Sequence, residues 1–118
     1  MDITYYTYPS CSTCRKAKKW LEQRGYEVKE VHLVNETPSV ETLRQLVIAS
    51  NEPLKSFFNT RGKVYRELGL KEKYETLTDE ERLALLASDG MLIKRPIAVK
   101  ADRVTIGFKE EMYEDVWG

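Results

Sequence analysis

The feature that most constrains the fold is a C-x-x-C pair placed between two segments of different periodicity. Residues 2–7, "DITYYT", are rich in β-branched and aromatic side chains and predict a strand. From Ser12 to about Arg24, the spacing of the apolar residues becomes helical. Cys11 and Cys14 therefore lie where a strand passes into a helix, and three interpretations follow: a redox pair, half of a metal site, or two thiols that fill space.

The rest of the chain continues this alternation. Residues 26–34 predict a second strand, and helical patterns occupy about 37–90. The runs "MLIKRPIAV" at 91–99 and "RVTIGF" at 103–108 predict a β-hairpin, and 109–117 predict a closing helix. The order β-α-β, helical segment, β-β-α is typical of a thioredoxin-like α/β fold: a four-stranded mixed sheet with helices on its faces and an inserted helical segment.

Length and charge narrow the possible functions. A chain of 118 residues fits one domain, so we expect a single, monomeric thioredoxin-like domain over residues 1–118. Basic and acidic residues both number 19, which leaves no net positive charge to hold a nucleic-acid backbone. No signal segment opens the chain and no apolar run approaches the roughly 20 residues of a membrane span, so we expect a cytoplasmic protein without a membrane partner. Structural disulfides rarely persist in that compartment, which favours redox or metal chemistry for the cysteines.

The surroundings of the pair favour redox chemistry. Cys11 is expected in the turn that opens the helix, where unpaired N–H groups and the helix dipole favour a thiolate. Arg15 and Lys16 add positive charge in the same turn. Cys14 follows at i+3, which brings its thiol toward Cys11, so that Cys11 attacks and Cys14 resolves. A zinc site would need two more ligands, and His32 is the one remaining strong nitrogen donor, so we predict no metal site and no bound cofactor.

Two arginines and a proline form a second group of candidates. Pro96 opens the predicted third strand, and an X-Pro bond there can be cis, which would present Arg95 to the region of Cys11. Arg61, in "FNTRG", is the other guanidinium predicted for this cleft, because such groups hold oxyanions and acidic thiol substrates in a bidentate manner. His32 lies on the predicted second strand, where a structural or solvent-facing role is expected.

The stretches "YPSCSTCRKA", "NTRGKVYRELGL", "DGMLIKRPIAV" and "VTIGF", in this order, resemble the arsenate reductase-related (ArsC/Spx) family over essentially the whole chain. The resemblance implies that Cys11 is the nucleophile, that Arg61 and Arg95 bind an oxyanion, and that Pro96 is the cis-proline of the fold. Arg15 would support the thiolate beside the substrate. The implied activity is a thiol-disulfide oxidoreductase that reduces arsenate or another oxyanion or thiol substrate, with glutathione and glutaredoxin, or thioredoxin, as external reductant.

The sequence also departs from the arsenate reductases of this family. Cys14 stands where the glutaredoxin-coupled enzymes usually have serine, Thr7 where they carry histidine, and the neutral "IGF" around Gly107 where a third arginine is expected. The C-x-x-C pair is similar to that of the Spx and MgsR regulators, which sense thiol stress and contact the RNA polymerase α subunit, although Asn51 and Glu52 replace their glycine. The likeness is greatest to short C-x-x-C arsenate reductase-like proteins of Gram-positive bacteria, in the Spx/MgsR-like branch. The alternative to an enzyme is therefore a redox-sensing transcriptional regulator.

Overall fold

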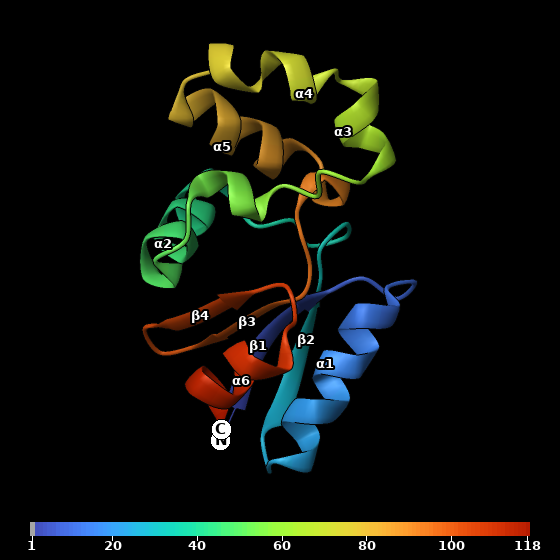
Figure 1. The fold of residues 1–118 in the computed structure, drawn as a ribbon, viewed down its shortest axis with the longest axis vertical. Helices are drawn as coiled ribbons and strands as arrows, with labels where there is room; N and C mark the ends of the chain where they lie inside the picture. The colour runs from blue at the N-terminus through green and yellow to red at the C-terminus, as the bar shows by residue number, and fades with distance from the viewer. Residues whose placement is uncertain (1) are drawn as a thin grey trace.

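The computed structural model describes residues 2–118 and is built around a mixed β-sheet of four strands (Figure 1). Met1, which the predicted domain range includes, lies outside the described residues. The strands are β1 (Asp2–Thr7), β2 (Glu27–His32), β3 (Ile97–Lys100) and β4 (Arg103–Ile106), in the spatial order β2-β1-β3-β4. β1 pairs in parallel with β2, whereas β3 is antiparallel to both of its neighbours. The predicted thioredoxin-like α/β fold is confirmed.

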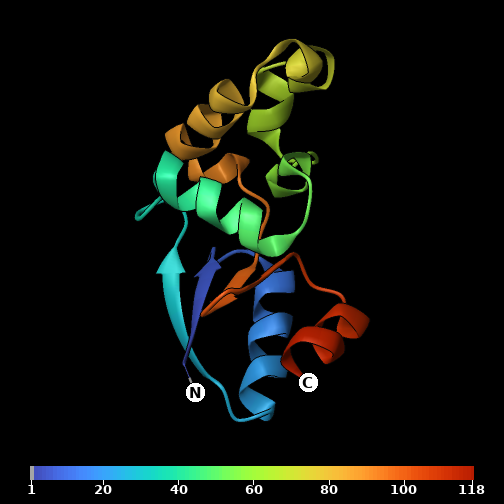
Figure 2. The same cartoon turned by 90° about the vertical axis from the view of Figure 1, so that its left-hand side faces the viewer.

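Two helices cover one face of this sheet, α1 (Ser12–Gln23) and α6 (Glu110–Trp117) (Figure 2). The buried faces of the two helices pack against the strand side chains that point to this side of the sheet. The buried cluster comprises Ile3, Tyr5, Ala17, Trp20, Leu21, Ala98, Tyr113 and Trp117. Trp117 also donates from Nε1 to the Thr105 hydroxyl at 3.0 Å. Both tryptophans therefore pack the core, as their helical spacing predicts.

The inserted helical segment lies between β2 and β3 in the chain and stands above the sheet in Figure 1. It contains α2 (Val40–Ser50), α3 (Lys63–Glu67), α4 (Leu70–Lys73) and α5 (Asp79–Ser88), with 3₁₀ turns at Leu54–Phe57, Tyr74–Thr76 and Gly90–Leu92. Ser39 and Thr78 cap α2 and α5 by accepting backbone N–H bonds, as their position before the apolar periodicity predicts. Among residues 2–118, no helix has the length and apolar character needed to cross a bilayer.

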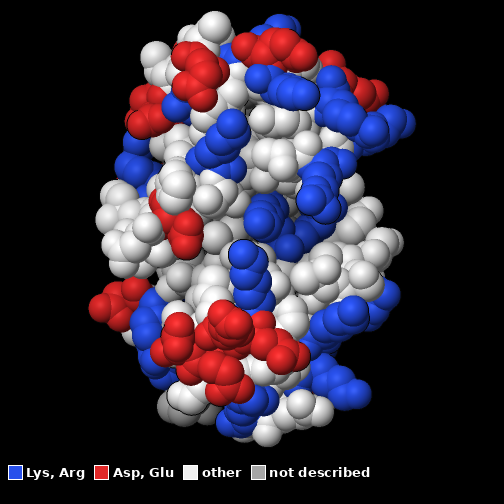
Figure 3. Space-filling view, viewed as in Figure 1, with Lys and Arg blue, Asp and Glu red and all other residues white. Residues whose placement is uncertain are grey.

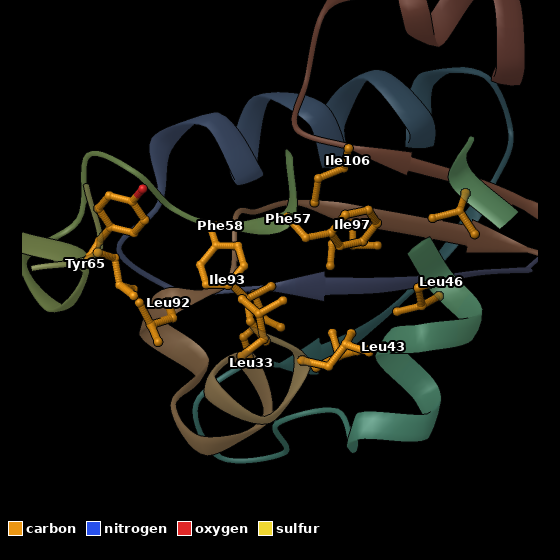
Figure 4. Close-up of a cluster of buried hydrophobic side chains, with 14 of the residues drawn as sticks. Leu33, Leu43, Leu46, Phe57, Phe58, Tyr65, Leu92, Ile93, Ile97 and Ile106 are labelled. Atoms are coloured by element: carbon orange, nitrogen blue, oxygen red, sulfur yellow. The ribbon is translucent and has the colours of Figure 1, made fainter. Parts of the chain in front are cut away.

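A second buried cluster joins this segment to the other face of the sheet (Figure 4). Leu43 and Leu46 of α2 and Phe57 of the following turn pack with Ile97 and Ile106 of the hairpin strands. Each such side chain contributes about 1.5–3 kcal/mol when it is fully removed from water. This second buried cluster therefore attaches the inserted segment to the sheet and holds the loops of the segment at one end of the sheet.

Three sequence expectations need correction. The predicted strand over 91–99 begins only at Ile97, because residues 90–92 form a 3₁₀ turn before it. The run "TDEERLALLAS" at 78–88 predicts a helix that Gly90 ends; instead α5 ends at Ser88, and Gly90 is buried against the backbone of Leu33. The charged run "KEKYE" at 71–75 is typical of a solvated helical face, but its tyrosine, Tyr74, is buried beneath the Arg82 guanidinium.

The packing at Gly90 generates a stability prediction. A Cβ there would lie 2.0 Å from the carbonyl oxygen of Leu33, a backbone atom that cannot swing aside. We expect Gly90→Ala to lower the free energy of unfolding by about 3 kcal/mol, the upper end of the usual cost of overpacking. Urea unfolding followed by circular dichroism measures it. Gly25→Ala is the matched control: its φ of +88° is strained for alanine, yet nothing lies within 4 Å, so a loss of only about 1 kcal/mol is expected. Equal losses at the two glycines would contradict the steric explanation.

Candidate active site

Cys11 occupies the N-cap position of α1, directly after the turn that leaves β1. Its backbone N–H donates to the Tyr8 carbonyl at 3.0 Å, which closes this turn. The Cys14 N–H donates to Cys11 Sγ at 3.2 Å. A sulfur that accepts an N–H bond at the N-terminus of a helix is placed as a capping oxygen would be. The half-buried Cys11 thiol remains accessible from the cleft described below.

Cys14 is held differently, with only 1% of its surface exposed. Burial raises the pKa of the Cys14 thiol to about 11, and the neighbouring Cys11 adds to this rise; hydrogen bonds from the Thr7 side chain and the Tyr8 backbone partly oppose it. The Cys14 carbonyl accepts a 2.6 Å bond from the buried Tyr5 hydroxyl. Both cysteines are free thiols. The pair thus combines an accessible sulfur at a helix terminus with a sheltered, protonated one, the arrangement that attack and resolution require.

A cleft of about 510 Å³ opens beside Cys11, between α1, the inserted segment and the end of the hairpin. Its lining residues are Cys11, Thr13, Glu52, Ser56, Asn59, Lys94, Arg95, Ile106, Gly107, Phe108, Lys109 and Met112. On the face of the molecule shown in Figure 3, lysine and arginine side chains gather around the middle, with acidic residues below them. The lining contains three cations and one carboxylate, so the cleft beside the thiol carries an excess of positive charge.

Of the second group of candidates, the structure places Arg95 in the lining of the cleft that also contains Cys11. The Arg95–Pro96 peptide bond is cis. The half-buried Arg95 lines the cleft with Cys11, and its guanidinium lies 5.2 Å from the centre of the Tyr8 ring. It donates to the Ile93 carbonyl at 3.1 Å. These contacts hold the side chain at the cleft wall and leave other N–H groups of its fork for a ligand.

The other two predicted arginines lie outside the lining of the cleft. Arg61 is exposed in the turn before α3. Arg15 is exposed on α1 and donates to the Pro9 carbonyl at 2.9 Å, which ties the helix to the turn that carries Cys11. A substrate role for either arginine stays a prediction.

Sequence reasoning missed two lysines of the site, Lys94 and Lys109. Both line the cleft, and neither forms an ion pair within residues 2–118. Lys94 lies against Gly107: a Cβ at Gly107, where φ is +76°, would be 3.0 Å from the lysine Cε. The only signal available from the sequence was their position beside "RP" and "GF", and a lysine next to a motif is usually a surface residue.

His32 has a structural role at the end of β2. Its Nδ1 accepts N–H bonds from Val34 and Asn35 at 3.2 and 3.1 Å, which shapes the turn after the strand. Its ring also meets that of Tyr8 edge-on, with the centroids 5.5 Å apart. In the described part of the chain, no three side chains among His, Cys, Asp and Glu come together as a metal site.

The profile of the ArsC family matches residues 6–116. The chain belongs to the ArsC family. The uncharacterised protein YusI of Bacillus subtilis is 54% identical over 117 residues, which cover 99% of each chain. The regulatory protein MgsR of the same organism is 37% identical over 91% of this chain and 83% of its own length. A solved structure of an ArsC family-related protein from Bacteroides fragilis superposes with a TM-score of 0.93, at 46% identity and with 98% of each chain covered.

The unequal environments of the two thiols generate a pH prediction. Because burial raises the pKa of Cys14 to about 11, the Cys14 thiolate is scarce at neutral pH and increases about tenfold for each pH unit below that value. Cys11→Ser removes the contribution of Cys11 to this rise but keeps burial, its largest cause. Alkylation of Cys14 by iodoacetamide in this variant should therefore still be slow at pH 7 and should rise up to pH 9.5. Mass spectrometry of quenched samples gives the rates. The same variant unfolded in urea is the control, and a plateau below pH 9 in the folded variant would contradict the assignment.

Proposed function

We propose that the chain is a thiol-disulfide oxidoreductase in which Cys11 attacks and Cys14 resolves. The observation that carries this proposal is the pair itself: Cys11 Sγ at the N-terminus of α1 beside a cationic cleft, with the Cys14 N–H bonded to it and the Cys14 thiol buried behind. Packed thiols that merely fill space would need neither the accessible sulfur nor the charged cleft. Arg95 would position an anionic substrate, with Arg61 and Arg15 as the further predicted cations.

The cycle needs an external supply of two electrons. Cys11 attacks the substrate, Cys14 attacks Cys11 Sγ and releases the reduced product, and the resulting Cys11–Cys14 disulfide is then opened by a thiol reductant. The family resemblance supports the glutathione-glutaredoxin or the thioredoxin system in this role. We place the protein in the cytoplasm as a single monomeric domain, where such reductants keep a C-x-x-C pair reduced.

Arsenate is the first oxyanion to test, because the family contains arsenate reductases. The guanidinium of Arg95 suits a tetrahedral oxyanion, since its planar fork donates two parallel hydrogen bonds. The neutral Gly107 occupies the region where the resemblance places a third arginine, and the cations that line the cleft there are Lys94 and Lys109. We therefore propose disulfides as candidate substrates in addition to arsenate.

The competing function is a redox-sensing transcriptional regulator that binds the α subunit of RNA polymerase. The observation in its favour is the 37% identity to MgsR together with the C-x-x-C pair. In that case the disulfide would alter a binding surface instead of serving turnover. Capture of the carboxy-terminal domain of the polymerase α subunit by one redox state of the protein and not by the other would favour the regulator. If neither state captures it, the regulator hypothesis is excluded.

An NADPH-coupled assay tests the enzyme. Arsenate and small disulfides are offered to the purified protein with the thioredoxin or the glutathione-glutaredoxin system. Cys11→Ser should lower turnover by more than about 100-fold, because the attacking thiolate is lost. Cys14→Ser should stop the cycle at a mixed disulfide on Cys11, visible by intact mass. Gln45→Ala, an exposed change on α2, is the control for folding and should retain full activity. Turnover that survives Cys11→Ser would refute the mechanism.

A further inference from the structure

We propose that the cleft selects a peptide-sized disulfide that carries carboxylates and an amino group, that is, the oxidised form of a low-molecular-weight thiol. This inference rests on the proposed thiol-disulfide exchange and adds the class of substrate. Two features of the cleft carry it: its size, and the charges that line it beyond Arg95.

The cleft is larger than a simple oxyanion requires. Its volume of about 510 Å³ falls in the range of pockets that enclose whole small molecules, about 300–1,000 Å³. A tetrahedral oxyanion occupies the space of about two or three water molecules of roughly 30 Å³ each. Most of the cleft would therefore stay empty around an oxyanion on Cys11, whereas a peptide-sized group would fill it.

The charges of the lining are separated along the chain and differ in sign. Lys94 precedes β3, Lys109 precedes α6, and Glu52 comes from the turn after α2. None of the three forms an ion pair within residues 2–118. With Arg95, the cations of the lining outnumber the acid. Figure 3 shows lysine and arginine side chains together around the middle of one face of the molecule. A ligand with several carboxylates and one ammonium group matches this set, with the carboxylates on the lysines and the ammonium on Glu52.

The chemistry balances in two steps. The Cys11 thiolate attacks one sulfur of R–S–S–R; a Cys11–S–S–R bond forms, and R–S⁻ leaves. Cys14 then attacks Cys11 Sγ, the second R–S⁻ leaves, and the Cys14 proton passes to a departing thiolate. The substrate disulfide is reduced to two thiols and the protein is oxidised to the Cys11–Cys14 disulfide. A dithiol reductant reopens this bond.

Four disulfide probes test the selection in the Cys14→Ser variant, in which the mixed disulfide on Cys11 accumulates. Oxidised glutathione carries carboxylates and ammonium groups, dithiodipropionate carries carboxylates alone, hydroxyethyl disulfide is neutral and cystamine is cationic. Rates of Cys11 modification are followed by intact mass and divided by each probe's rate with free mercaptoethanol. We expect oxidised glutathione to react at least tenfold faster than hydroxyethyl disulfide, cystamine to be slowest, and the advantage to shrink in high salt.

Substitutions in the lining assign the effect to residues. Lys94→Gln and Lys109→Gln, each added to Cys14→Ser, should slow oxidised glutathione and dithiodipropionate three- to tenfold and leave hydroxyethyl disulfide unchanged. Glu52→Gln should slow oxidised glutathione by about threefold and should leave dithiodipropionate, which has no ammonium group, unchanged. Lys71→Gln, an exposed lysine outside the cleft, is the matched control and should change none of the rates.

The outcomes separate the two proposals. Equal normalised rates for charged and neutral probes, or variants that slow all probes alike, would overturn the selection while the redox pair stands. Failure of Cys11 to react with any probe would overturn the proposed oxidoreductase function as well. The expected order of probes, together with a loss confined to the carboxylate-bearing probes in the lysine variants, would establish the substrate class.

Discussion

The site depends on the hydrogen bond from the Cys14 N–H to Cys11 Sγ, which fixes the cysteine pair to the first turn of α1. That turn stays in place because the next turns of the helix are buried: Ala17 and Leu21 are fully covered by the sheet and α6. Sheet packing therefore sets both the direction in which Cys11 faces and the depth at which Cys14 lies. The unequal environments of the two thiols are a consequence of the core, since one sulfur caps the helix and the other joins its buried face.

The second wall of the site depends on the attachment of the inserted segment. The close approach of Gly90 to Leu33 and the packing of Phe57 against the hairpin hold the turns after α2 near the end of the sheet. Those turns supply Glu52 to the cleft, and the segment that leads into β3 supplies Arg95. Without this attachment Cys11 would face open solvent, and a substrate would meet the charges of only one wall.

Local patterns were sufficient to predict the elements and the cysteine pair. Alternation and β-branching predicted β1, caps at Ser39 and Thr78 predicted the starts of two helices, and the order of segments predicted the mixed sheet. The features that the sequence did not predict depend on contacts between segments that are distant in the chain. The role of Gly90 requires the position of the β2–α2 turn, and the place of Lys94 and Lys109 in the cleft requires the hairpin to be folded against α1. No local periodicity contains such information.

The same geometry supports the proposed substrate class, because it sets which cations line the cleft near Gly107. Gly107 has a positive φ and no side chain, so the aliphatic part of Lys94 lies close to it, and Lys109 follows two residues later. The charge of this wall is thus carried by two flexible ammonium groups, which are compact point charges on long stems, in place of a planar guanidinium. A guanidinium fork matches the adjacent oxygens of one tetrahedral oxyanion, whereas two independent lysines match carboxylates that lie apart. Under the proposed substrate selection, this wall would retain attraction for anions and would favour larger ligands that can reach both lysines while their sulfur meets Cys11.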